Sequence, residues 1–240
     1  MRACLSRGGT LEAHSLRDNR LKLPMEVNVY LPPCYIEDAP VRYPVLYLLH
    51  GQNFAEDQWV RLGAPATADR LIAAGEIPPF LMVMPRDRLW EDPQKSPFDE
   101  VFLEALLPWV DESFRTLAVR EDRAVGGLSR GGAWAVHFGL SRPDLFGALG
   151  GHSAPVFWED TYRVRGWLNA LTPEDTPRIY LDIGEKDYLM NSNRWLVGVL
   201  EKKNVPYSWV LFPGYHEEAY WQTHLESYLR WYAEGWQTPP

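Results

Sequence analysis

One serine stands between glycines in a pattern typical of a catalytic nucleophile. Gly127, Ser129 and Gly131 occupy the fixed positions of a G-x-S-x-G pentapeptide. A short run that can form a strand precedes it, and residues 133–140 follow with apolar side chains at helical spacing. A turn between strand and helix strains the serine backbone and projects its hydroxyl group, and glycine fits beside it because it has no Cβ atom. We therefore predict Ser129 as a nucleophile. The alternative is a glycine-rich turn with an inert serine.

A serine hydroxyl group needs a base, which is normally a histidine oriented by a carboxylate. Where such a turn occurs in an α/β sheet, the chain order is serine, acid, histidine. Asp187 follows the expected strand at residues 178–184, and His216 follows the expected strand at residues 207–212. We predict Asp187 as the acid and His216 as the base.

Other carboxylates and histidines compete for these roles. Asp182 lies inside the expected strand, where a structural role is more common, while Glu185 stays open as an alternative acid. His152 follows a strand but precedes the expected acid, so the chain order counts against it. Two further histidines fall within expected helices, where packing and surface roles are more common: His137 and His224.

Acyl transfer also needs N–H donors for the oxyanion of the tetrahedral intermediate. Sites with this kind of turn take one donor from the residue after the serine, here Arg130, and another from the loop after an early strand. His50-Gly51-Gln52 lies in that loop, and we predict the backbone of Gln52 as the second donor. His50 is expected to hold the loop shape, and the side chain of Arg130 is expected to point to solvent.

Apolar runs and amphipathic segments alternate along the chain. Strands are expected at residues 10–17, 25–31, 44–49, 80–84, 123–125, 145–151, 178–184 and 207–212. Helices are expected at residues 64–75, 99–114, 133–140, 192–203 and 217–234, with Pro108 kinking or interrupting the second. The alternation predicts an α/β fold with a mostly parallel sheet covered by helices on both faces. Ligands then bind beyond the carboxyl ends of the strands.

The composition restricts the class of protein. A chain of 240 residues suits one α/β domain over residues 1–240, and 46% hydrophobic content can bury a sizeable core. The net charge of −8 argues against nucleic-acid and anionic-membrane partners. Cys4 and Cys34 make no disulfide scaffold, and no motif has metal-ligand spacing, so no metal or other cofactor is expected. Without a signal-peptide core or a membrane-spanning apolar run, a cytoplasmic location is expected.

With these motifs identified, the chain resembles the esterase D family of α/β-hydrolases. The resemblance covers nearly the whole chain and rests on four segments: Tyr43–Gly51, Gly126–Gly132, Asp182–Asp187 and Gly214–His216. It implies an α/β-hydrolase fold with Ser129 as nucleophile, Asp187 as acid and His216 as base. The family includes S-formylglutathione hydrolases, feruloyl and acetyl xylan esterases, siderophore esterases and mycolyltransferases, so the resemblance does not choose a substrate.

The chain departs from the family pattern in two ways, and these narrow the expected class of substrate. The loop at residues 51–59 contains no cysteine, unlike the cysteine-bearing loop typical of the formylglutathione enzymes. The segment between His152 and Arg178 is too short for a large lid, which favours small or extended soluble esters with short acyl chains. Trp59 and Trp158 are candidates to flank an apolar acyl or aromatic group, and ordinary packing is the alternative for each.

The sequence therefore predicts a serine carboxylic ester hydrolase whose partner is a small-molecule ester. An acyltransferase is the enzymatic alternative, and a non-catalytic binding module on a hydrolase fold is the alternative from another class. All three candidate triad members are present, which argues against the binding module. The sequence leaves homo-oligomer formation open.

Overall fold

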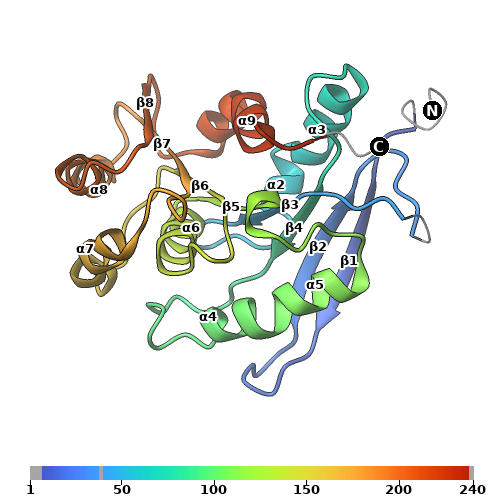
Figure 1. The fold of residues 1–240 in the computed structure, drawn as a ribbon, viewed down its shortest axis with the longest axis horizontal. Coiled ribbons are helices and arrows are strands. Elements are labelled where there is room, and N and C mark those ends of the chain that lie inside the picture. The colour runs from blue at the N-terminus through green and yellow to red at the C-terminus, as the bar shows by residue number, and fades with distance from the viewer. Residues whose placement is uncertain (1–6, 38–39, 238–240) are drawn as a thin grey trace.

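The computed structural model describes residues 7–37 and 40–237, so Cys4 lies outside the described residues. Its centre is an eight-stranded sheet, which extends in Figure 1 from β1 on the right to β8 on the left. The strands are β1 (Thr10–Leu16), β2 (Met25–Leu31), β3 (Val45–Leu49), β4 (Leu81–Pro85), β5 (Arg123–Leu128), β6 (Ala148–His152), β7 (Arg178–Gly184) and β8 (Ser208–Phe212). Their order is β1-β2-β4-β3-β5-β6-β7-β8. β2 pairs antiparallel with β1 and β4, and every other neighbouring pair is parallel.

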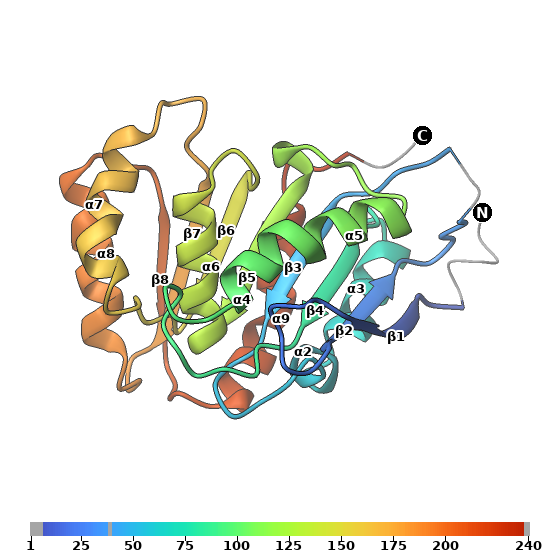
Figure 2. The ribbon, with the colours of Figure 1, turned by 90° about the horizontal axis from the view of Figure 1, so that it is seen from below.

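Helices cover both faces of the sheet, as Figure 2 shows from the side of α4, α5 and α6. One face carries α4 (Phe98–Val101), α5 (Leu107–Ser113), α6 (Arg130–Ser141), α7 (Asp160–Ala170) and α8 (Met190–Lys202). The other carries α2 (Gln58–Arg61), α3 (Ala64–Ala73) and α9 (Glu218–Ala233). A 3₁₀ turn, η2 (Arg120–Asp122), leads into β5. The predicted mostly parallel sheet with two helical layers is confirmed.

The central strands are apolar on both faces because each face packs into a separate core. In β3, Val45, Tyr47 and Leu49 belong to the core under α4–α8. Leu46 and Leu48 alternate with them and belong to the core under α2, α3 and α9. A continuous apolar run is the expected pattern for a parallel strand buried on both sides.

The helix expected at residues 99–114 is interrupted before Pro108. Between α4 and α5 the chain forms a π-helical turn, η1 (Phe102–Leu106). Pro108 lies in the helical chain just after this turn, and because it has no N–H group it cannot donate a hydrogen bond to a carbonyl group of the preceding turn. The predicted interruption is therefore confirmed, and it takes the form of a wider turn.

The segment between β6 and β7 contains a helix that the sequence analysis did not predict. This helix is α7, which packs on α6 and buries Val164 and Leu168 in the core.

In the part of the chain that the structure describes, no helix is both long and apolar enough to cross a membrane.

Candidate active site

Ser129 occupies a sharp turn between β5 and α6. Its backbone has φ 53° and ψ −123°, a strained combination for a residue with a side chain. Its N–H group donates to the carbonyl oxygen of His152 at 2.9 Å, which ties the turn to the end of β6. A Cβ atom on Gly127 would overlap the carbonyl group of Gly131, and one on Gly131 would overlap the carbonyl group of Leu49. The two glycines of the pentapeptide are therefore required by close backbone approach.

The structure brings Ser129, His216 and Asp187 into one hydrogen-bonded chain. The Nε2 atom of His216 lies 2.9 Å from the Oγ atom of Ser129. The Nδ1 atom of His216 lies 2.8 Å from the Oδ2 atom of Asp187. Each residue follows the carboxyl end of a parallel strand, namely β5, β7 and β8. This is the arrangement in which a histidine removes the serine proton while a carboxylate fixes the tautomer of the ring.

The loop after β7 is bonded to the loop after β8, which sets the position of Asp187. The N–H groups of Glu185 and Lys186 donate to the carbonyl oxygens of Phe212 and Gly214 at 2.8 and 2.9 Å. The Oδ1 atom of Asp187 accepts the N–H group of Leu189 at 2.8 Å, so Oδ2 is turned to the histidine. Asp187 is buried, whereas Glu185 is exposed.

The two predicted oxyanion donors belong to the loop after β3 and to the start of α6. Gln52 lies in the turn after β3 and lines one cleft with Ser129 and His216. Arg130 is the first residue of α6, and N–H groups in the first turn of a helix have no acceptor within that helix. The geometry is therefore compatible with the backbones of Gln52 and Arg130 as the two donors.

Gln58 forms a hydrogen bond to the loop that carries Gln52. The sequence analysis did not select Gln58. Its Oε1 atom accepts the N–H group of Gly51 at 2.8 Å, and its Nε2 atom donates to Oε1 of Glu218 at 3.1 Å. Gln58 is completely buried. No motif in the sequence marks this residue, because its two partners come from the loop after β3 and from α9.

The side chain of Arg130 does not point to solvent, which corrects the expectation. It is buried, and its Nε atom lies 2.9 Å from Oδ2 of Asp87. Its Nη2 atom donates to the carbonyl oxygens of Leu89 and Glu91 at 2.7 and 2.6 Å. The Nε1 atom of Trp134 donates to the same oxygen of Asp87 at 2.9 Å. A guanidinium group can enter the core here because a carboxylate and two carbonyl groups satisfy it.

His50 and His152 are both engaged away from Ser129. His50 is buried, its Nδ1 atom donates to the Gly51 carbonyl group at 2.8 Å, and its Nε2 atom accepts the N–H group of Asp87 at 2.9 Å. Burial lowers the pKa of His50, which favours the neutral ring that this pattern needs. His152 bonds to Asp182 at 2.6 Å through Nδ1 and to Tyr232 at 2.9 Å through Nε2. These contacts give Asp182 a partner other than His216.

The two remaining histidines also lie outside the triad. His137 in α6 lies 2.8 Å from Oδ2 of Asp160 and 3.4 Å from Oδ1 of Asp99. His224 in α9 stacks on Phe212 with ring centroids 3.9 Å apart. Both contacts join secondary-structure elements of the fold.

Of the two tryptophans predicted to flank a substrate, Trp59 is placed elsewhere. It is 1% exposed, belongs to the core under α9, and donates from Nε1 to the carbonyl oxygen of Leu49 at 3.0 Å. It packs beneath the loop and does not flank a bound group, which corrects that expectation. Trp158 is 70% exposed and contacts Tyr162 edge to face, and it is absent from the described lining of the cleft.

Aromatic side chains that the sequence analysis did not select flank the predicted base. The ring of Tyr188 lies 4.6 Å from the ring of His216, and the ring of Trp221 lies 5.0 Å from it. Both residues line the cleft, which has a volume of about 370 Å³, and Phe54 lines it as well. The described residues contain no group of three or more His, Cys, Asp or Glu side chains that could hold a metal ion.

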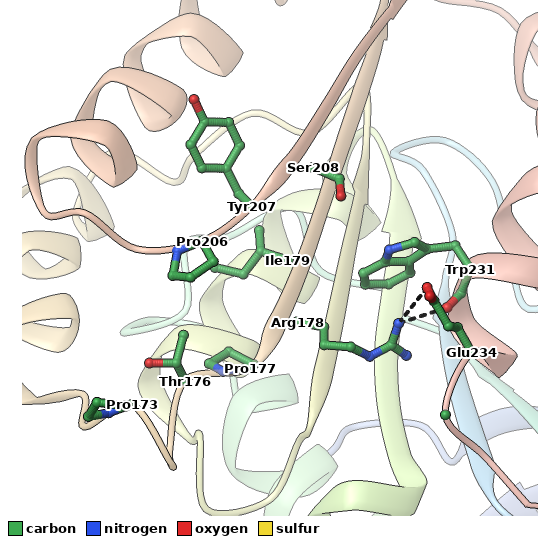
Figure 3. Close-up of a pocket in the computed structure, with 11 residues that line it drawn as sticks. Pro173, Thr176, Pro177, Arg178, Ile179, Pro206, Tyr207, Ser208, Trp231 and Glu234 are labelled. Carbon is green, nitrogen blue, oxygen red and sulfur yellow. Dashed lines mark hydrogen bonds and ion pairs between the residues drawn. The ribbon is translucent and has the colours of Figure 1, made fainter.

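A larger pocket, of about 510 Å³, lies at the amino ends of β7 and β8, whereas Ser129 lies at the carboxyl ends of the strands (Figure 3). Arg178 and Ser208, the first residues of β7 and β8, line it together with Trp231 and Glu234 from the end of α9. Arg178 lies over the ring of Trp231 and donates to its carbonyl oxygen at 3.0 Å. The described residues that line this pocket include no serine–histidine pair. The smaller cleft at Ser129 is therefore the candidate active site.

Comparison with known proteins identifies the family of the chain. The family model described as "Putative esterase" matches residues 18–232. The chain belongs to this family. An endo-1,4-beta-xylanase/feruloyl esterase of Xylanibacter ruminicola is 33% identical over 171 residues, covering 67% of this chain and 22% of that protein. An esterase of Mycobacterium tuberculosis is 34% identical over 140 residues, covering 54% of this chain and 29% of that protein. The chain thus spans less than a third of the length of these two relatives.

Solved structures show the fold. A ferulic acid esterase superimposes with a TM-score of 0.83 at 22% identity, covering 94% of this chain and 98% of the other. An S-formylglutathione hydrolase from Staphylococcus aureus superimposes with a TM-score of 0.74 at 19% identity, covering 94% and 99%. This member of the esterase family therefore has the α/β-hydrolase fold.

Proposed function

We propose that the protein is a serine carboxylic ester hydrolase acting on short-chain or small soluble esters, including aromatic and carbohydrate-linked ones. The observation that carries the proposal is the hydrogen-bonded chain from Ser129 through His216 to Asp187. The feruloyl esterase activity named for one relative supports the aromatic part of the substrate class. The open cleft, which α7 does not line, supports small or extended esters.

In the proposed reaction, Nε2 of His216 takes the proton of Ser129 as its Oγ atom attacks the ester carbonyl carbon. The backbone N–H groups of Gln52 and Arg130 bind the oxyanion, and the N-terminus of α6 favours its negative charge. The imidazolium then protonates the leaving alcohol, and Asp187 stabilises the charged ring. Water, activated by the same histidine, releases the acid from the acyl-enzyme and regenerates Ser129.

Replacing the nucleophile tests the proposal. Ser129→Ala should fold like the wild type and lose activity on a p-nitrophenyl ester by a factor on the order of 10⁴–10⁶ in kcat. Circular dichroism and thermal unfolding establish that the fold is retained. A variant that keeps more than about a tenth of the wild-type rate would rule out the assigned mechanism.

Product analysis distinguishes hydrolysis from acyl transfer. An acyl-enzyme can pass its acyl group to water or to an alcohol, and the triad serves both acceptors. Products are therefore measured with and without an added alcohol. Free acid as the main product in both conditions supports the hydrolase, whereas a new ester as the main product supports an acyltransferase.

A further inference from the structure

The described residues that line the cleft at Ser129 include carboxylates and no lysine or arginine. Glu217 and Glu218 follow His216 directly, and both line the cleft. The formal charge that these side chains place around a bound substrate is therefore negative.

The two carboxylates differ in how far their charge is balanced. Oε1 of Glu218 lies 3.0 Å from Nη2 of Arg61 and accepts a further hydrogen bond from Gln58. Glu217 is exposed, and no residue in the described part of the chain forms an ion pair with it. Lys186, on the neighbouring loop, donates to the hydroxyl group of Tyr215 at 3.2 Å and is not part of the cleft lining. Glu217 thus contributes an unbalanced negative charge.

Helix N-termini do not reverse this balance. The N-termini of α6 and α9 both lie at the cleft and carry partial positive charge. Ser129 stands at the first of them, where the oxyanion of the reaction forms. Glu217 and Glu218 occupy the start of α9, so two negative charges already lie at its positive end. Arg61 lies over the ring of Phe54, which lines the cleft, but its guanidinium group is already paired with Asp57 and Glu218. Among the described lining residues, a negative group on a substrate would therefore meet Glu217 and no cation.

We propose that Glu217 is a specificity-determining residue that selects neutral and cationic esters over anionic ones. The inference rests on the proposed function, because it concerns the ester that reaches Ser129. Like charges a few ångströms apart in water repel by an energy that corresponds to a several-fold change in binding. Repulsion over this distance is only partly screened at about 0.1 M salt, where the Debye length is roughly 10 Å.

Three aryl acetates of similar shape provide the test: 3-acetoxybenzoate, 3-acetoxybenzamide and 3-acetoxyphenyltrimethylammonium. They carry negative, zero and positive charge on the leaving group and share one acyl group. For each ester, kcat/KM is measured for the wild type, for Glu217→Gln and for Glu217→Lys at low and high salt. Comparing variant with wild type on the same ester cancels the intrinsic reactivity of that ester.

For Glu217→Gln, the ratio of kcat/KM for the anionic ester to that for the neutral ester should rise about three- to tenfold. The ratio of the cationic to the neutral ester should fall, Glu217→Lys should enlarge both changes, and high salt should reduce them. The side chain of Glu217 makes no capping hydrogen bond to α9, so both variants should fold.

Glu234→Gln is the matched control. Glu234 is an exposed carboxylate at the opposite edge of the sheet, so its loss should leave both ratios unchanged (Figure 3). Equal ratios in Glu217→Gln and wild type, or the same change in Glu234→Gln, would overturn the inference while the esterase proposal stands. A wild-type protein that cleaves none of the three esters would contradict the esterase proposal, and this inference with it.

Discussion

The loop after β7 offers two carboxylates two residues apart, and only one of them reaches His216. Asp187 is buried, with one oxygen on the Leu189 N–H group and the other on the histidine ring. Glu185 is exposed, and its backbone N–H group donates to the carbonyl oxygen of Phe212. Both residues follow the same strand, so the turn of the loop decides which of the two carboxylates contacts His216.

Amide substitutions distinguish the two carboxylates. Asp187→Asn keeps the size of the side chain but removes its charge and favours the wrong histidine tautomer, so kcat should fall by a factor on the order of 10⁴. Glu185→Gln should have a mild effect because the side chain does not contact the triad. Both variants are assayed on one short ester. If the two outcomes were exchanged, Glu185 would be the acid.

The residues that meet at the cleft could be selected where a short motif follows an expected strand. Ser129, Asp187 and His216 were selected because each follows a strand and the order of the three is typical of this fold. Trp59 and the side chain of Arg130 were misplaced because their surroundings come from distant segments. The partner of Arg130 is Asp87, 43 residues away, and no local spacing indicates that contact.

At the scale of elements, His137 joins three helices. It belongs to α6, contacts Asp160 at the start of α7, and lies near Asp99 in α4. Burial by itself would lower its pKa, but the hydrogen bonds and the charges of the two aspartates outweigh burial and raise the pKa of His137 to about 9. The charged ring therefore stabilises the folded state relative to the unfolded one.

This contact makes the stability of the protein dependent on pH in a defined direction. The stabilisation is fully present below the unfolded pKa of about 6.5, and it is lost as the pH rises through the folded pKa of about 9. The loss is on the order of 3 kcal/mol. Urea unfolding of the wild type at pH 6 and pH 10 should show the decrease.

His137→Gln is the comparison for this experiment, because glutamine keeps hydrogen-bonding capacity and carries no titrating charge. Its free energy of unfolding should be lower than that of the wild type at pH 6 and should change less between the two pH values. An equally large decrease in the variant would show that other groups cause the pH dependence.

The regular elements could be located because their patterns are local. Buried strands appear as short apolar runs, and α6, α8 and α9 follow helical periodicity. α7 was missed because its segment carries a weak apolar stripe in which Val164 and Leu168 are the buried apolar residues. Its position depends on packing against α6 and on the contact between Asp160 and His137, which arise only in the folded chain.

At the scale of the whole molecule, the parallel sheet gathers the proposed site from segments far apart in the sequence. β3, β5, β7 and β8 end at one edge, where Gln52, Ser129, Asp187 and His216 lie. Because β3 and β5 are neighbours, the loop that carries Gln52 lies beside Ser129. The family and the fold were anticipated from the motifs, whereas a single-domain organisation, a cytoplasmic location and the state of assembly stay predictions.

The shape of the cleft bears on the acyl group that the proposed esterase would accept. Its volume is about 370 Å³, and its lining comes from the loops after β3, β5, β7 and β8 together with the start of α9. α7, which occupies the connection where a lid could be built, packs on α6 and contributes no described lining residue. A long acyl chain would therefore leave the cleft and lie on the protein surface, where it buries little apolar area.

We accordingly expect a preference for short acyl chains. Across p-nitrophenyl esters, kcat/KM should be highest for acetate or butyrate and should decline for long chains. The burial of each added methylene group stabilises binding by about 0.8 kcal/mol only while that group enters an apolar surface. Rates are measured at one detergent concentration for all esters, and Ser129→Ala gives the background. A steady rise of kcat/KM with chain length would show an acyl-binding channel and reject the expectation.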